Sequence, residues 1–287
     1  MRTLLLPLLL LPAWAGEEAP VDIGLVLRES KEFRAKCEEF RISYEAGQVR
    51  ALGRINQRGG PCEYLITVAP AKAHETIVLL DKGERPAAKE GAERRPEPLN
   101  GLAETLNNAF LAAGFKKGEA LKWNEETGEV FAPSGETVHL YAEWKDEKGA
   151  LRRARMSDWL WCWETIDPMR PGLYVFTGSV LIDEGPPDHK NWLGCEVDGL
   201  VAAVLSTSTA ILDHREEGGL SNGAYEAIPA RVPAVGTRVT CVFSRVELDA
   251  TEKYEPLKLT PELEAEKKKK AEERAAREKE KALAPGK

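Results

Sequence analysis

The sequence predicts an α+β fold made mainly of antiparallel β-strands, with one principal body helix and a charged C-terminal helix. Two patterns carry this prediction. Apolar and polar residues alternate in several short segments, and the segment before Gly114 repeats its apolar residues at helical spacing. Because 43% of the 287 residues are hydrophobic, the chain can bury a substantial core. We therefore expect one large β-rich domain over residues 21–250.

The first residues are typical of a secretory signal peptide. Arg2 precedes an apolar run over residues 4–11, and an A-x-A cleavage site ends at Ala15. The run is well short of the roughly 20 apolar residues that cross a bilayer. We therefore expect removal of residues 1–15, a chain that begins at Gly16 without a transmembrane segment, and a location in the periplasm or outside the cell.

Period-two alternation marks the expected strands. The alternating apolar residues are Phe40, Ile42 and Tyr44, then Val138, Leu140, Ala142 and Trp144, and later Val239, Cys241 and Phe243. Each set places one face toward the core, as half-buried antiparallel strands do. Residues 145–149 predict a hairpin turn between strands over 138–144 and 150–155. Asp198-Gly199 predicts a second, tighter hairpin, because this dipeptide tolerates positive φ angles.

The principal body helix is expected at about residues 99–113, and Gly114 supplies its C-terminal stop. The segment before it, residues 82–98, is rich in Gly, Pro and charge. Such a segment buries too little apolar surface to offset its ordering entropy, which indicates an exposed loop.

The last segment, residues 258–287, differs in composition from the body. Thr260 and Pro261 are typical of a helix start, and Glu and Lys or Arg residues then recur one turn apart. Large apolar residues are nearly absent. We therefore expect a solvated helical or disordered tail whose removal changes stability very little.

Charge and cysteine content exclude several classes of site. The formal charge of −7 argues against binding of nucleic acid or other acidic partners, which requires a basic face. The five cysteines are Cys37, Cys62, Cys162, Cys195 and Cys241. Their spacing matches no redox, zinc or iron–sulfur motif. We expect buried thiols with at most two disulfides, whose pairing the sequence leaves open, and no metal or cofactor.

Lys72, His74 and Glu75 form the densest polar cluster in the sequence. In an extended segment Lys72, His74 and Thr76 would share one face, with Glu75 on the other. A His beside a carboxylate is suited to general acid–base catalysis. The favoured alternative is that His74 and Glu75 organise a turn or strand end through hydrogen bonds.

Further candidate residues lie in two other segments. Trp159, Trp161 and Trp163 alternate next to Asp158, and an extended segment would put the three indoles on one face, suited to stacking sugar rings. Burial in the core is the favoured alternative. Ser179 follows Gly178 in a strand-like run over residues 173–182, where a Gly marks a bulge or a close backbone approach rather than a nucleophile elbow.

Several stretches occur in an order that resembles the YdjY-like domain of bacterial envelope proteins. They are Cys62-Glu63-Tyr64-Leu65, Lys72-Ala73-His74-Glu75-Thr76, Leu106 to Gly114 with Phe115-Lys116-Lys117-Gly118, Ser157-Asp158-Trp159, Val175-Phe176-Thr177-Gly178-Ser179 and Asp198-Gly199. The resemblance covers residues 21–248, and Tyr174 stands where the family pattern has Trp. It implies an envelope location but no established activity.

Two classes of function follow from these observations. The favoured hypothesis is a non-catalytic envelope domain that binds an envelope protein or a wall polymer, or has a structural role. The alternatives are a hydrolase that uses His74 and Glu75, and a carbohydrate-binding module that uses the Trp cluster.

Overall fold

The computed structural model of the protein describes residues 22–80, 101–124, 126–182 and 192–283. It is an α+β fold with mainly antiparallel strands, as the sequence predicts. The expected signal peptide at residues 1–15 and the expected loop at residues 82–98 lie outside the described residues. Within the described ranges, every helix is too short or too polar to cross a bilayer.

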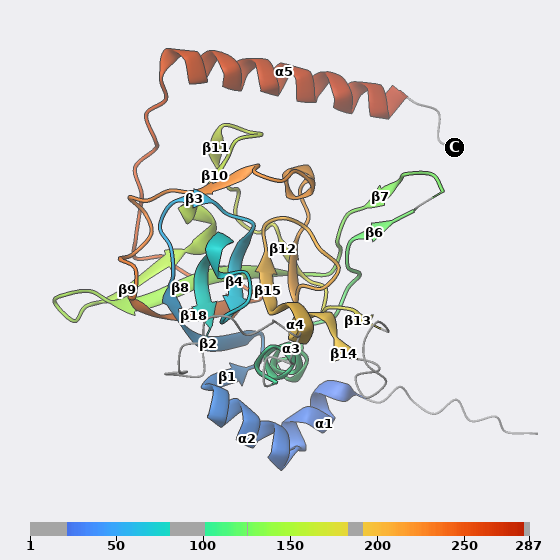
Figure 1. Ribbon diagram of the computed structural model, residues 1–287, viewed down its shortest axis with the longest axis vertical. Helices are drawn as coiled ribbons and strands as arrows, with labels where there is room; N and C mark the ends of the chain where they lie inside the picture. The colour runs from blue at the N-terminus through green and yellow to red at the C-terminus, as the bar shows by residue number, and fades with distance from the viewer. Residues whose placement is uncertain (1–21, 81–100, 125, 183–191, 284–287) are drawn as a thin grey trace, which may run out of the picture.

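Eight strands close into a barrel (Figure 1). In barrel order they are β2 (Gln48–Ile55), β18 (Arg238–Ser244), β8 (Glu136–Lys145), β12 (Tyr174–Phe176), β16 (Leu212–His214), β15 (Leu200–Ala203), β4 (Tyr64–Val68) and β5 (Thr76–Leu80). β5 pairs back onto β2 in antiparallel register. The pairs β15–β16 and β4–β5 are parallel, and the other neighbouring pairs are antiparallel.

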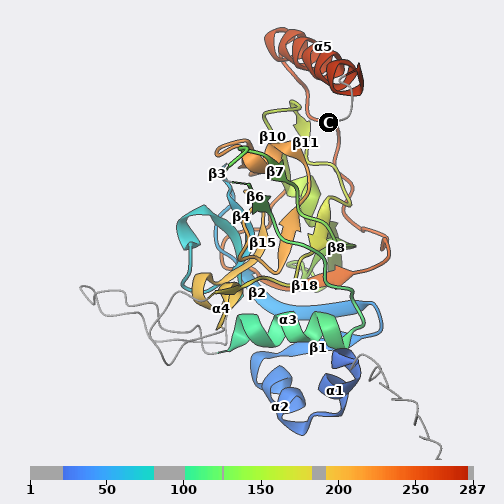
Figure 2. The same cartoon turned by 90° about the vertical axis from the view of Figure 1, so that its right-hand side faces the viewer.

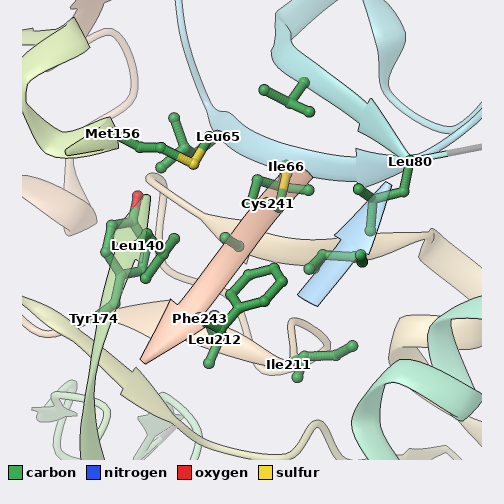
Figure 3. Close-up of a cluster of buried hydrophobic side chains, with 14 of the residues drawn as sticks. Leu65, Ile66, Leu80, Leu140, Met156, Tyr174, Ile211, Leu212, Cys241 and Phe243 are labelled. Atoms are coloured by element: carbon green, nitrogen blue, oxygen red, sulfur yellow. The ribbon is translucent and has the colours of Figure 1, made fainter. Parts of the chain in front are cut away.

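The barrel interior is filled by apolar side chains (Figure 3), as expected for a barrel of this strand number. The labelled members are Leu65, Ile66, Leu80, Leu140, Met156, Tyr174, Ile211, Leu212, Cys241 and Phe243. In β18 the predicted inward residues Val239, Cys241 and Phe243 are at most 1% exposed, but Val242 and Ser244 on the other face are buried too, so the strand is half-buried only at its start.

Further strands extend the barrel or lie beside it. β1 (Ile42–Glu45) pairs with β2, and β9 (Leu151–Arg155) pairs with β8 across the predicted 145–149 turn. A small sheet contains β11 (Asp167–Pro168), β10 (Leu160–Cys162), β17 (Tyr225–Ala227) and β3 (Gly60–Pro61). Two short ribbons pair β13 (Leu181–Ile182) with β14 (Trp192–Leu193), and β6 (Lys122–Trp123) with β7 (Val130–Phe131).

The predicted body helix is α3 (Leu102–Ala112), and it covers one end of the barrel (Figure 2). Gly114 follows the helix with φ of 82°, and the Phe115 N–H bonds back to the Phe110 carbonyl at 3.0 Å. This arrangement satisfies the free carbonyl groups at the helix end. Phe110 stacks on Phe176 of β12, with ring centroids 5.0 Å apart, and contacts Phe243 of β18 edge-on.

The hairpin predicted at Asp198-Gly199 is wrong. Residues before it form a short helix, α4 (Gly194–Asp198), and Gly199 ends that helix with φ of 71°. Both structures require a positive φ after Asp, so the dipeptide alone does not distinguish them. α4 carries Glu196, whose carboxylate accepts hydrogen bonds from Gly101 N at 2.6 Å and Glu104 N at 3.0 Å, and so caps α3.

Two helices that the sequence analysis did not predict precede β1. α1 (Ile23–Glu29) and α2 (Lys31–Phe40) pack against α3, so the body contains more than one helix of note (Figure 2). The strand expected to include Phe40 begins at Ile42 instead, because Phe40 is the last residue of α2 and Arg41 follows with φ of 55°.

The charged C-terminal helix is confirmed as α5 (Pro261–Leu283), on the opposite side of the barrel from α1 and α2 (Figure 1). The expectation that it lies clear of the body is wrong. Leu263 packs with Leu259 against Trp161, Ile166 and Ile228. Polar contacts continue along the helix: Lys267 pairs with Asp167 at 2.5 Å, Lys270 donates to Trp163 O at 3.0 Å, and Arg274 donates to Glu164 O at 3.1 Å.

The chain between β18 and α5 is held against the body by hydrogen bonds. Leu248 N donates to the Tyr141 hydroxyl at 2.8 Å, Thr251 N donates to Arg153 O at 2.9 Å, and the Tyr254 hydroxyl donates to Arg231 O at 3.0 Å. We call residues 246–260 the strap. It fixes where α5 begins.

Barrel closure predicts a strong effect at Gly53. A Cβ at this position in β2 would lie 2.8 Å from Leu79 O of β5. We expect Gly53→Ala to lower the free energy of unfolding by about 1–3 kcal/mol, because one strand must shift. Urea unfolding measures the effect. Gly59→Ala is the control, because its Cβ would meet only a Pro229 ring carbon at 3.2 Å. Equal, small effects at the two positions would contradict the described closure.

Docking of α5 predicts that its removal destabilises the body. Deletion of residues 261–287 exposes Trp161 and should cost about 1–2 kcal/mol, a fall of roughly 2–8 °C in the unfolding midpoint. Deletion of residues 278–287 is the matched control, because it keeps Leu263, Lys267, Lys270 and Arg274. An unchanged midpoint for the longer deletion would show that α5 does not pack on the body.

Candidate functional site

Residues 72–75 form a tight turn rather than an extended segment. Lys72 has φ of 49°, and Ala73–Glu75 is a 3₁₀ turn, η1. The expectation that Lys72, His74 and Thr76 share one face is therefore wrong. The His74 side chain is 75% exposed, and its Nε2 lies 3.4 Å from Glu75 Oε1. An exposed pair of this kind contributes little to stability.

Other side chains supply the hydrogen bonds that hold this turn. Asn56 Nδ2 donates to Ala73 O at 2.5 Å and to Thr76 O at 2.8 Å. Thr76 Oγ1 donates to Lys72 O at 2.7 Å, and Thr67 Oγ1 donates to Ala71 O at 2.9 Å. The organising role predicted for His74 thus belongs to Asn56, Thr67 and Thr76.

The fold brings the Cys62–Leu65 and Lys72–Thr76 motifs together, because the Glu63 and Glu75 carboxyl groups share a hydrogen bond. Partial burial and a hydrogen bond with the Glu75 carboxyl raise the pKa of Glu63, although Lys72 opposes the shift. Two carboxyl groups that share a proton beside an imidazole could exchange protons with solvent. The other sequence-predicted candidates lie elsewhere in the fold. Asp158 lines a cavity with residues of α5, and Ser179 contacts α4.

The contacts of this turn predict opposite outcomes for two substitutions. His74→Ala should change the free energy of unfolding by less than about 0.5 kcal/mol, because the His74 side chain is 75% exposed and loses only its contact with Glu75. Asn56→Ala should cost about 1–3 kcal/mol, because it leaves two backbone carbonyls without their donor. Thermal unfolding of both variants beside the parent tests this. A larger loss for His74→Ala than for Asn56→Ala would contradict the assignment.

Ser179 is buried and fully engaged. It has φ of 56°, and its Oγ donates to Thr209 O at 2.7 Å and accepts from Cys195 N at 2.9 Å. The hydroxyl therefore ties α4 to the loop before β16 and is not poised as a nucleophile. The run at residues 173–182 is not one strand, since β12 ends at Phe176. A close approach does occur at Gly178, where a Cβ would lie 2.7 Å from Lys117 Cδ.

The three indoles do not share one face. Trp159 ends the 3₁₀ turn η2 (Met156–Trp159), is fully buried, and donates from Nε1 to the Tyr254 hydroxyl at 3.2 Å. Because η2 interrupts the period of two, the expected platform is wrong. Trp161 is 8% exposed and Trp163 is 38% exposed. These two rings meet edge to face, with centroids 5.9 Å apart.

Asp158 and Trp161 do come together, in a cavity of about 400 Å³ beneath α5. We call it the α5 cavity. Its remaining walls are Asp167, Pro168, Arg231, Tyr254, Pro256, Leu257, Leu259 and Lys267. The strap, α5 and the β10–β11 region therefore each contribute a wall. Trp161 Nε1 is buried and has no hydrogen-bond partner among the described residues.

Asp158 and Arg231 are two ionisable residues that line the α5 cavity. Burial raises the pKa of the Asp158 carboxyl, against the opposing influence of Arg155 and Arg231. The Arg231 guanidinium donates to Asp158 O at 3.0 Å and Glu255 O at 2.8 Å, and lies 5.1 Å from the Tyr254 ring centroid. The cavity thus combines a carboxyl group, a fixed cation and an indole.

A second cavity of about 340 Å³ adjoins the first, because both include Asp167 and Lys267. Its other walls are Thr165, Arg170, Ala271, Arg274 and Ala275. Three cations and one carboxylate line this space, but Arg170 is paired with Glu216 and Lys267 with Asp167, so most of the positive charge is balanced. The small side chains of Ala271 and Ala275 leave room on the inner face of α5.

The sequence patterns did not predict that Arg231, Tyr254 and α5 contribute to this site. A signal was present in Leu257, Leu259 and Leu263, which are apolar residues in a polar segment. They are too few to give a periodic pattern, and their partner Trp161 lies about a hundred residues earlier. The five cysteines are unpaired and buried, which confirms the expected buried thiols.

A buried carboxyl group lies apart from this site, at Asp213 in β16. Burial raises the pKa of Asp213 to about 7, although it accepts hydrogen bonds from His214 N at 2.7 Å and Thr207 N at 3.1 Å. Burial lowers the pKa of the neighbouring His214 to about 3. The two groups therefore affect stability with opposite dependence on pH.

The raised pKa predicts how Asp213→Asn depends on pH. The contribution of Asp213 is fully present below its unfolded pKa near 4 and is lost as pH rises through about 7. Between pH 4.5 and 8 the variant should therefore gain stability relative to the parent by on the order of 2–4 kcal/mol. His214 titrates in both proteins and cancels. Urea unfolding at the two pH values measures the shift, and a constant difference would contradict it.

Comparison with known proteins gives no further guide: no family model, no curated protein and no solved structure matches the chain. Within the described residues, no group of three or more His, Cys, Asp or Glu side chains is arranged to hold a metal ion. The candidate site therefore rests on its own geometry.

Proposed function

We propose that this chain is an exported, non-catalytic binding protein of the bacterial envelope, and that the α5 cavity binds a saccharide unit of a wall polymer. The observation that carries the proposal is that Asp158, Trp161, Arg231 and Tyr254 together line one cavity of about 400 Å³. Membership of the YdjY-like family is part of the proposal and rests on the motifs within residues 21–248.

The groups of the α5 cavity suit a sugar ring. Sugar hydroxyls both donate and accept hydrogen bonds, so they can pair with the Asp158 carboxyl. The apolar face of a sugar packs on aromatic and aliphatic surface such as Tyr254 and Leu257. The adjoining cavity can hold an acidic substituent near Arg274, since Arg170 is paired with Glu216. Wall saccharides carry both kinds of group.

Three features support binding over catalysis. His74 is exposed on an outer turn, the Ser179 hydroxyl is engaged on both sides, and Asp167 is paired with Lys267. None of these groups is placed as an activated nucleophile or base beside Asp158. The hydrolase hypothesis based on His74 and Glu75 thus gains no support from the geometry.

Calorimetric titration with a soluble disaccharide–peptide fragment of peptidoglycan tests the proposal. We expect saturable binding by the full exported chain, weakened about tenfold or more by Asp158→Asn, which changes the carboxyl group of the cavity, and by Trp161→Phe, which shrinks its aromatic wall. Trp123→Phe is the matched control, since Trp123 is 65% exposed on β6, outside the α5 cavity.

Unfolding curves of the variants establish that they are folded before affinities are compared. Absence of binding by the folded parent would overturn the proposed ligand. Equal weakening by Trp123→Phe would place the site elsewhere. Release of new reducing ends from the fragment would contradict a non-catalytic role.

A further inference from the structure

One stripe of side chains along α5 faces the body. The described α5 residues that are less exposed than their neighbours are Leu263, Lys267, Lys270 and Arg274, spaced four, three and four residues apart. This spacing places them on a single face of a helix. Leu263, in the first turn, is the only large apolar residue of α5 before Leu283. We call these four residues the inner stripe, and beyond Leu263 it is cationic.

The contacts of the inner stripe change in kind along the helix. Leu263 packs on the apolar cluster around Trp161. Beyond it, Lys267 pairs with a carboxylate of the body, and Lys270 and Arg274 donate to backbone carbonyl oxygens. The Lys267 side chain is 38% exposed, so water and salt reach the ion pair. Exposed charge contacts contribute little and are screened by salt. Apolar packing therefore holds the first turn of α5, and charge holds the rest.

Hydrogen bonds anchor the strap to the body as far as Glu255. The Tyr254 hydroxyl donates to Arg231 O, and the Arg231 guanidinium donates to Glu255 O. Within the described part of the chain, no hydrogen bond joins residues 256–260 to the body. α5 is connected to the body through this short segment, at its N-terminal end (Figure 1). The segment can therefore turn without breaking a hydrogen bond to the body.

The α5 cavity and the second cavity both lie between α5 and the body. Lys267 lines both of them, and Ala271 and Ala275 line the second. The opposite walls belong to the body, and those of the α5 cavity include Asp158 and Trp161. Movement of α5 away from the body would therefore open both cavities at once. It would leave Asp158 and Trp161 in place, because neither belongs to α5 or to the strap.

We propose that α5 is a lid of the α5 cavity, which lifts from its C-terminal end by turning at residues 256–260. The ionic contacts of Lys267, Lys270 and Arg274 hold the lid closed, so salt favours the open position. Leu263 lies nearest the turning segment and moves least. That the lid admits a saccharide rests on the proposed function, whereas its movement does not depend on any ligand.

The distance between two spin labels in the full exported chain, measured by electron spin resonance without ligand, tests the lid. The labels are attached through Leu220→Cys, in the 3₁₀ turn η4 (Glu217–Leu220), and Glu272→Cys, on an exposed position of α5. The five native cysteines are buried, so labelling is selective.

We expect one distance at about 0.1 M salt and a second, longer population at about 1 M salt, where the Debye length falls from about 10 Å to about 3 Å. Glu272 is roughly 17 Å along the helix from Pro261, so lifting α5 by a few tens of degrees lengthens the distance by about 10 Å. Leu220→Cys with Lys253→Cys is the matched pair. It keeps the second label on the anchored strap and should give one distance at both salt concentrations.

Two sets of substitutions separate the inner stripe from the total charge of α5. The first set should populate the longer distance already at about 0.1 M salt, because it removes the cations of the stripe: Lys267→Gln, Lys270→Gln and Arg274→Gln. The second set should leave the distance unchanged, because it removes as many cations from exposed positions of the same helix: Lys268→Gln, Lys269→Gln and Arg277→Gln.

A distance that stays the same in high salt and in the inner-stripe variant would overturn the lid. Equal opening by both sets would also overturn it, since total charge rather than the stripe would then hold α5. A longer distance from Lys253 in high salt would show that the strap leaves the body, against a turn at residues 256–260. Because no saccharide is present, failure of the proposed ligand leaves these outcomes unaffected.

Discussion

The fold depends on the pairing of β2 with β5, because this contact turns an open sheet into a barrel. β2 pairs with β18 along most of its length, with β1 only over Gln48–Ala51, and with β5 at its C-terminal end, where Gly53 lies opposite Leu80. The two backbones approach so closely that a Cβ on Gly53 would collide with the Leu79 carbonyl. Closure removes both sheet edges of this region and encloses the apolar side chains that fill the interior.

Once the barrel is closed, its two ends have different coverings. At one end α3 inserts Phe110 against Phe176 and Phe243, and Glu196 from α4 caps the helix. At the other end the small sheet, the strap and α5 lie over one another, and their polar and aromatic side chains leave the α5 cavity between them. The cavities at the end that carries α5, of about 400 and 340 Å³, exceed the one of about 120 Å³ among α1, α2 and α3 at the other end.

The sequence predicts those elements whose signals are local. The alternation in β8 and β18, the 145–149 turn, α3 with its Gly114 stop, and the Thr260–Pro261 helix start are each encoded within a few residues. The errors arise where distant contacts decide the structure. Asp198-Gly199 ends α4, which is held in place by the hydrogen bonds between Glu196 and the start of α3. The 3₁₀ turn η2 places Trp159 away from Trp161 and Trp163. Leu263 alone could not indicate that α5 docks on Trp161. Half of the candidate site, Asp158 and Trp161, was therefore predictable, whereas Arg231, Tyr254 and the α5 wall were not.

Binding of a wall saccharide in the α5 cavity, against Trp161, can be tested directly. The most direct measurement follows the indole N–H resonances of the exported chain by NMR during titration with the peptidoglycan fragment, with Trp161→Phe used to assign the Trp161 peak. Because Trp161 lines the α5 cavity, we expect this peak to shift progressively and saturably while the Trp123 and Trp159 peaks stay in place. A titration that leaves the Trp161 peak unmoved, or that moves the exposed Trp123 peak instead, would contradict it.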